Sequence, residues 1–525
     1  MSTLTPFRRL ALCVFVATGV GLGCATPSAQ QHSDQQASSK ETVVKPLELP
    51  DVQRFQLDNG LTILIVENHQ VPYAAFRLLM KAGSLQDPDG KEGLAKLTTG
   101  LLTYGTQTKS EDEISKKVDF LGATLGAISG SSNMQVYGDI TTVNKSNLKS
   151  FFDLMTDVVL NPVFPEDGLQ RLRTRMVGAL TASKDDNSTL ANRAFAMTLF
   201  NNHPYGRTAS GHPKTLNALT RDDVVDFHQR YFLPEHAVLG VSGDVNPEEI
   251  VAWAKAAFGE NWGNNENGER ICIPADGLTS TCSAFNLNGS SANNERLTLP
   301  TEAEKLKPGI RVVVVDRDDP SLNQVQWRMG HQGVHTFDSP DWFDFRLGTQ
   351  LLGGDFTARL NQVLRVREGL TYGARLNVGH AKKVPGKVAV STYVKPKDLR
   401  RAVELALGEM EGVAKQPVPS EELASFKSKI IESLPFRFET ANDTLAEYIS
   451  LIAGDRDVSF LENYPVGISK VTEEGAQKAL ARGVKTDALL LVVVANASIV
   501  EELQPLVDER GGSIEVITVE SLYEE

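Results

Sequence analysis

The sequence predicts an α+β fold made of two copies of one β-rich, helix-backed unit, joined by a linker. Two alignments within the chain indicate the duplication: Gly309-IRVVVVD matches Gly60-LTILIVE at an offset of 249 residues, and Ala488-LLLVVVAN matches Ala237-VLGVSGDV at an offset of 251. Between the copies, residues 260–308 are rich in Asn, Gly, Ser, Thr and Glu and have little hydrophobic period, which is typical of a linker or surface insert.

The first copy spans 49–260 and mixes strands with helices. Asp58-Asn59-Gly60 predicts the turn of a hairpin within 52–67. Ser110 and Glu113 predict a capping box at the start of a helix over 111–121. Hydrophobic periodicity predicts further strands over 73–82, 124–129, 134–142 and 237–243, and further helices over 93–102, 148–160, 166–183 and 221–231.

The second copy, 309–525, contains the stretch LLGGDFTARLNQVLRVREGLTYGAR over 351–375. Its glycine pair, apolar helical spacing and later glycine predict turn, helix, turn and strand. Arg365 falls at the end of the helix and Tyr372 at the start of the strand, so a forked cation and a phenol could both point at one peptide carbonyl or oxyanion. The structural alternative is that Arg365 caps the helix and pairs with Glu368 while Tyr372 packs.

The amino-acid composition excludes some classes of function. The 525-residue chain has a formal net charge of -13 and no concentrated basic stretch, which argues against nucleic-acid binding. Beyond the N-terminus, no apolar run is long enough to cross a bilayer.

The N-terminus predicts export. Arg8 and Arg9 precede a short apolar run, and Gly23-Cys24 closes a signal peptide over 1–24, followed by a polar tether over 25–48. Small residues before a cysteine resemble a bacterial lipoprotein cleavage site, with Leu22 one place closer to the cysteine than usual. Two outcomes are open, lipid attachment at Cys24 or cleavage and release, and both place the mature protein in the periplasm or on the outer membrane of a bacterium.

The linker, 261–308, contains two cysteines. Cys272 and Cys282 lie close together in a polar segment, and an oxidising compartment favours a local disulfide between them. The alternative is two free thiols.

Four stretches carry a resemblance to a known family: DNGLTILIVEN, GLAKLTTGLLTYGT, NNHPYGRTASGHPKTLNALTRDDVVDFHQRYFLPEHAVLGVSGDV and LLGGDFTARLNQVLRVREGLTYG. With the duplicated unit, they resemble the pitrilysin/insulinase family of zinc peptidases, close to its mitochondrial-processing-peptidase-like branch, over about residues 50 to 520. The resemblance implies two homologous α/β-roll domains, each a mostly antiparallel sheet backed by helices.

Active members of that family carry H-x-x-E-H on a helix of the first copy, with a further glutamate on a later helix. Here Lys96 stands at the first histidine, Thr99 at the glutamate and Gly100 at the second histidine, and Leu169–Leu180 contains no glutamate. A protonated lysine has no lone pair to donate, and a threonine is too weak a base to activate bound water. We therefore expect no metal and no cofactor in this chain.

No other part of the sequence restores a metal site. The nine histidines are dispersed, and Gly333 with its β-pattern argues against a helical pair at His331 and His335. The positions of the second copy that correspond to the lost motif are Phe345, Gly348 and Thr349.

The resemblance also implies a role for Arg365 and Tyr372. In active members an arginine and a tyrosine seven residues apart in the second copy bind the substrate backbone and assist the zinc site. Some bacterial members divide the two sets between chains. We therefore expect a non-catalytic subunit whose partner is an H-x-x-E-H chain that holds the zinc, with a peptide as substrate. The alternative is an inert scaffold or binding protein of the same fold.

Overall fold

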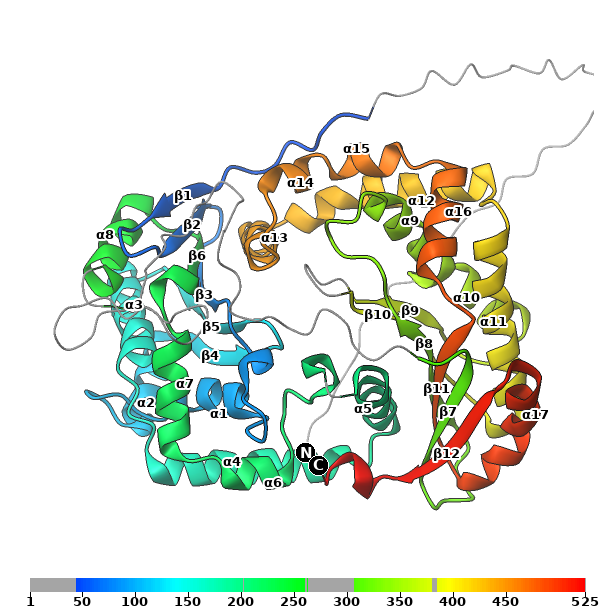
Figure 1. Cartoon of the computed structure of the whole chain (residues 1–525). Coiled ribbons are helices and arrows are strands. Elements are labelled where there is room, and N and C mark those ends of the chain that lie inside the picture. The colour runs from blue at the N-terminus through cyan, green and yellow to red at the C-terminus, as the bar shows by residue number, and fades with distance from the viewer. Residues whose placement is uncertain (1–43, 202, 260–261, 263–305, 380–384, 525) are drawn as a thin grey trace, which may run out of the picture. The chain divides into compact units, whose positions relative to one another are not determined.

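The computed structural model describes residues 44–201, 203–259, 262, 306–379 and 385–524. Within them the chain forms two six-stranded mixed sheets, each with helices packed against it (Figure 1). The first sheet has the order β1-β2-β6-β3-β5-β4 and the second β12-β7-β11-β8-β10-β9. The strands of the first sheet are β1 (Gln53–Gln56), β2 (Thr62–Glu67), β3 (Tyr73–Met80), β4 (Ala123–Ser129), β5 (Met134–Thr141) and β6 (Ala237–Gly243). Those of the second are β7 (Gly309–Asp316), β8 (Val325–Gln332), β9 (Arg375–Val378), β10 (Lys387–Val394), β11 (Ala488–Ala495) and β12 (Gly512–Thr518).

The two sheets share one arrangement of strands. In the first, β2 runs parallel to β6, and β6, β3, β5 and β4 follow as antiparallel neighbours. In the second, β7 runs parallel to β11, and β11, β8, β10 and β9 follow in the same way. The sheets differ at one edge, where β1 is antiparallel to β2 and β12 is parallel to β7. This repeated order confirms the predicted two-unit α+β fold.

The helices that follow the first sheet's strands were largely predicted. Helices α2 and α4 and strand β6 have the predicted bounds, and the Ser110–Glu113 capping box is present. Helix α3 begins three residues earlier than expected. The helices of this half are α1 (Leu94–Leu101), α2 (Glu111–Leu121), α3 (Lys145–Leu160), α4 (Glu166–Ser183), α5 (Asn187–Phe200), α6 (Pro213–Ala218), α7 (Arg221–Tyr231) and α8 (Pro247–Phe258).

The second half departs from the prediction in the stretch 351–375. The glycine pair ends a helix, because Gly353 is the last residue of α9 and Gly354 caps it. The predicted single helix divides into one short helical turn and the wide π-helical turns of η6 (Gln362–Arg367), and β9 begins only at Arg375. The helices of this half are α9 (Trp342–Gly353), α10 (Arg359–Asn361), α11 (Leu399–Lys415), α12 (Ser420–Ser433), α13 (Ala441–Ala453), α14 (Val458–Glu462), α15 (Tyr464–Ser469), α16 (Glu473–Gly483) and α17 (Val500–Arg510).

Each half contributes one helix to the sheet of the other. Helix α5 packs on β8 and β11 of the second sheet, and α13 packs on β6 and β2 of the first (Figure 1). Apolar side chains of α13 and of the first sheet form a separate core. The side chains of this core are Leu64, Val66, Leu79, Val238, Leu445, Tyr448, Ile449 and Ile452. None of the described helices is long and apolar enough to span a bilayer.

Candidate functional site

The positions that the resemblance assigns to the zinc motif lie on α1, and the polar side chains at these positions are directed to local partners. Lys96 is exposed, and its ammonium donates a hydrogen bond to Ser210 Oγ at 2.9 Å. Thr99 is buried, and its hydroxyl donates to the Ala95 carbonyl oxygen at 2.7 Å, one turn earlier on the same helix. Neither side chain presents a lone pair suited to a divalent cation.

At the third position of the lost motif, Gly100, the neighbouring helix fills the space. A Cβ built at Gly100 would lie 2.9 Å from Leu172 Cδ2 on α4. The side chains of α4 that are buried are Leu169, Leu172, Met176 and Leu180, all apolar. At the position where zinc would be held, α1 and α4 therefore pack against each other through apolar side chains. The residues present do not fit the metal.

The start of α1 is organised by a buried carboxylate. Asp87 accepts hydrogen bonds from the amides of Gly93 and Ala95, each at 2.8 Å, and its side chain is almost fully buried. Burial raises the pKa of Asp87 to about 7, the two amide hydrogen bonds oppose that rise, and the nearby charge of Glu92 adds to it. Asp87 thus titrates near neutral pH.

This titration predicts a pH-dependent stability. Protonated Asp87 stabilises the fold most fully below the ordinary carboxyl pKa, and that contribution is lost as pH rises toward 7. Relative to Asp87→Asn, we expect the wild-type free energy of unfolding to fall by up to about 4 kcal/mol between about pH 4 and pH 7. Urea unfolding at each pH measures this, with the exposed Asp89→Asn as control. Parallel pH curves for wild type and Asp87→Asn would contradict it.

The described histidines do not gather into a metal site. His331 Nε2 accepts from the Lys485 amide at 2.9 Å, whereas His335 stacks on Phe345 with ring centroids 3.8 Å apart and contacts Asp341 at 3.2 Å. Among the described residues, no group of three or more His, Cys, Asp or Glu side chains is placed to hold a metal ion.

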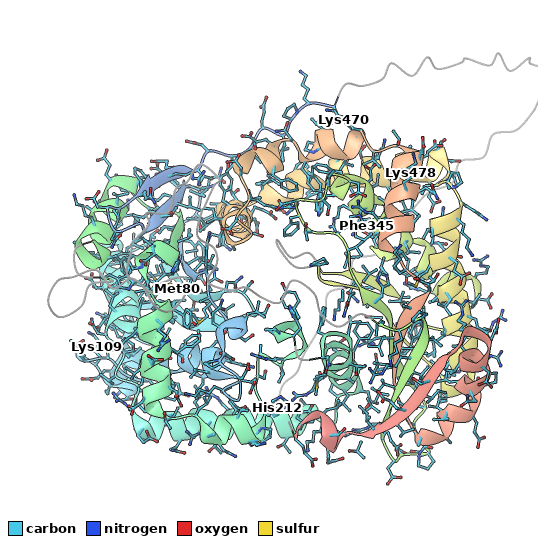
Figure 2. The ribbon with its side chains drawn as sticks, viewed as in Figure 1. Met80, Lys109, His212, Phe345, Lys470 and Lys478 are labelled. Carbon is cyan, nitrogen blue, oxygen red and sulfur yellow. The ribbon has the colours of Figure 1, made fainter. Side chains whose placement is uncertain are left out.

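The residues that the sequence offset of 249 matches to the lost motif, Phe345, Gly348 and Thr349, have structural roles. Phe345 lies on α9 (Figure 2) and is fully buried, and Thr349 is buried with its hydroxyl bonded to the Arg346 carbonyl at 3.0 Å. A Cβ built at Gly348 would lie 2.7 Å from Leu480 Cγ, so α9 packs closely on α16 at this point.

The segment that carries Tyr372 is held from both sides. Buried Asn361 donates from Nδ2 to the Asp355 carbonyl at 2.7 Å and accepts from the Ala374 amide at 2.8 Å. The Thr392 hydroxyl on β10 donates to the Gly373 carbonyl at 2.8 Å. These bonds fix the backbone of the two residues that follow Tyr372, and Tyr372 itself lies before β9 rather than at the predicted start of a strand.

Tyr372 and Arg365 are both available to a further molecule. The Tyr372 side chain is 79% exposed, and within the described part of the chain it makes no hydrogen bond. The guanidinium of Arg365 lies over the Phe356 ring, 3.9 Å from its centroid, and has no carboxylate partner among the described residues. Glu368 pairs with Arg401 at 2.6 Å instead of with Arg365, so the purely structural arrangement considered for this pair is not the one that forms.

Two features of this site are missing from the sequence-based prediction. Stacking of Arg365 on Phe356 joins residues on either side of α10, and no local pattern predicts it. The signal for Asn361 was available, because a polar residue occupies the apolar side of a helical pattern between Leu360 and Leu364, where only a satisfied amide can be buried. Cys24, Cys272 and Cys282 lie outside the described residues, as does most of the linker 261–308.

Comparisons with known proteins identify the family of this chain. Residues 62–212 match the family model Insulinase (Peptidase family M16), and residues 218–430 match the model Peptidase M16 inactive domain. The chain belongs to the insulinase family of peptidases. It is similar to an uncharacterized zinc protease of Streptomyces coelicolor, 23% identical over 76% of this chain and 80% of the relative. It is also similar to a probable mitochondrial-processing peptidase subunit beta of Arabidopsis thaliana, 22% identical over 40% of this chain and 39% of the relative.

Solved structures share the fold. A peptidase M16 inactive domain from Pseudomonas fluorescens superimposes with a TM-score of 0.70 at 20% identity, covering 85% of this chain and 98% of that one. The periplasmic protease PqqL of Escherichia coli superimposes with a TM-score of 0.67 at 16% identity, covering 90% of this chain and 52% of that one. The family models and the zinc-protease relatives show that the chain is a protease-like member of its family.

Proposed function

We propose that this chain is the non-catalytic subunit of an exported, heterodimeric zinc peptidase and supplies Arg365 and Tyr372 to the partner's active site. One contrast carries the proposal: α1 has lost every metal-binding side chain, while Arg365 and Tyr372 stay open on a fixed segment. An inert scaffold has no need to keep, on one segment, an exposed phenol and a cation that has no carboxylate partner among the described residues.

The chemistry of the pair suits peptide hydrolysis. A peptide bound in extended form along an edge strand of the partner is held by main-chain hydrogen bonds. The Tyr372 hydroxyl then donates to the oxyanion that forms as water attacks the scissile carbonyl, and the Arg365 guanidinium donates to a neighbouring carbonyl of the peptide. Zinc belongs to the partner chain, since the residues of α1 and α4 here cannot hold it.

Export is supported by the N-terminal signal pattern and by likeness to a protease described as periplasmic. Of the two outcomes for Cys24, lipid attachment places the complex at the membrane surface, and cleavage alone releases it into the periplasm.

A reconstitution experiment tests the function. Cleavage of a quenched fluorogenic peptide mixture is measured with this chain alone, with an H-x-x-E-H relative from the same cell alone, and with both, and the metal content of each chain is determined. We expect hydrolysis only in the mixture and zinc only in the relative. No gain on mixing, with the relative fully active alone, would contradict the proposal and favour the scaffold. Chelator-sensitive hydrolysis by this chain alone would also contradict it.

A further inference from the structure

The duplication places an equivalent arginine in each sheet. Arg77 on β3 donates from Nη1 to the carbonyl of the preceding residue, Phe76, and to that of Gly138 across the sheet, at 2.9 and 3.0 Å. Arg328 on β8 donates from Nη1 to the preceding Trp327 carbonyl at 2.9 Å and to the cross-strand Thr392 carbonyl at 3.4 Å. Both guanidiniums therefore lie on the sheet face that receives the helix from the other half.

The two arginines differ in their hydrogen bonds to the helix that packs on their sheet. Arg328 donates from Nε to Asn192 Oδ1 at 2.8 Å and from Nη2 to Ser188 Oγ at 2.7 Å, both on α5. Arg77 instead donates from Nη2 to Asp139 Oδ1 on β5 at 2.7 Å. Its Nε has no acceptor among the described residues, and α13 supplies none.

The helix residues at the corresponding positions explain the difference. Helix α5 follows its N-cap Asp186 and α13 follows its N-cap Thr440, so Ser188 corresponds to Asn442 and Asn192 to Ala446. The carboxamide that binds Arg328 is thus replaced by a methyl group beside Arg77.

A cleft of about 320 Å³ opens where that carboxamide is missing. Its polar lining combines Arg77, Asn133 and Gln135 of the sheet side with Asn442 and Ser450 of α13. Within the described part of the chain, these side-chain amides and this hydroxyl form no hydrogen bonds. Its apolar lining includes Leu79 and Ile449, so the cleft offers donors and acceptors above a hydrocarbon floor.

We infer that this cleft binds the primary carboxamide of an asparagine or glutamine side chain in a bound peptide, in the position that Asn192 takes against Arg328. Neutral amides match the site because Asp139 already balances the charge of Arg77, which removes the reason to prefer an anion. An amide oxygen accepts from Arg77 Nε, and its NH₂ donates to the oxygens of the neighbouring carboxamides.

The inference rests on the proposed function in one respect only, which is that the bound peptide is the substrate. The binding itself belongs to this chain and is measured without a partner.

The test uses the full chain and fluorescein-labelled peptides of alternating Ala and Ser that differ at one central residue, Gln, Glu or Leu. By fluorescence anisotropy we expect the Gln peptide to bind about tenfold more tightly than the other two, as two additional hydrogen bonds allow. Ala446→Asn restores the internal carboxamide and is expected to abolish that preference. Ala446 is exposed, so the variant folds normally, and Ala446→Ser, whose side chain is too short to reach Arg77, is the matched control that keeps the preference.

Equal affinity for the three peptides, or a Gln preference that survives Ala446→Asn, would overturn the inference. The outcomes separate it from the proposed function. Hydrolysis on mixing without any Gln preference would contradict the amide site and leave the proposed function standing. A Gln preference without hydrolysis on mixing would contradict the proposed function and leave the amide site standing.

Discussion

Arg365→Ala is expected to lower kcat/KM of the reconstituted peptidase about 10²–10³-fold, with assembly of the two chains unchanged. Among the described residues the Arg365 guanidinium contacts the Phe356 ring but has no carboxylate partner, so its loss leaves no buried polar group without a partner. The effect therefore falls on substrate rather than on folding. Tyr372→Phe is expected to lower kcat about 10²-fold with KM nearly constant, because a bond to the oxyanion forms only in the transition state. Steady-state cleavage of one fluorogenic peptide measures both effects.

Arg367→Ala is the matched control for charge. Arg367 lies in the same wide helical turns, its side chain is 65% exposed, and its contact with Glu409 is 3.9 Å long. We expect little change in turnover from this variant. Full activity of Arg365→Ala in an assembled complex, shown by size-exclusion chromatography, would contradict the role proposed for Arg365.

Arg328→Met is expected to lower the free energy of unfolding by about 2–4 kcal/mol, since it leaves the acceptors of α5 and β10 without their buried donor. Arg328 is buried, and burial lowers its pKa to about 10, so its guanidinium stays charged at neutral pH and depends on these acceptors. Urea unfolding measures the loss, and hydrogen exchange over Asn187–Phe200 shows whether α5 loosens from the second sheet.

The duplicated fold supplies the control. Arg77→Met removes the equivalent arginine, which makes no bond to α13, and Asp139 keeps its hydrogen bonds from Tyr73 and Thr124. We expect a smaller loss of stability and unchanged exchange over Ala441–Ala453. Equal losses from the two variants would show that the bonds between Arg328 and α5 contribute no net stability.

Much of the fold could be predicted because its signals are local. Helices α2 and α4 and strand β6 form within the predicted bounds, since capping residues and hydrophobic period operate over a few positions. Helix α5 was not predicted. Its buried residues include Leu190, Ala194, Phe195 and Leu199, and because it packs on a sheet from the other half, they do not form one narrow apolar stripe.

The residue offset between the two copies also shows how far a local sequence pattern can be used. Sequence matching at an offset of 249 places Gln326 over Arg77, whereas the hydrogen bonds equate Arg77 with Arg328, an offset of 251. A shift of two residues keeps every side chain on the same face of a strand, so the hydrophobic pattern cannot detect it. Only the bonds across the sheet define the correct equivalence.

By itself the sequence determined the duplicated fold, the family resemblance, the lost metal ligands at positions 96, 99 and 100, and the two residues worth testing, Arg365 and Tyr372. These conclusions depend on which side chains are present and on short-range periodicity. The tertiary structure alone decided that Glu368 pairs with Arg401, that Phe356 supports Arg365, and that a cleft lies beside Arg77. Each of these features depends on how different segments of the chain pack together. A local residue pattern carries no information about such packing.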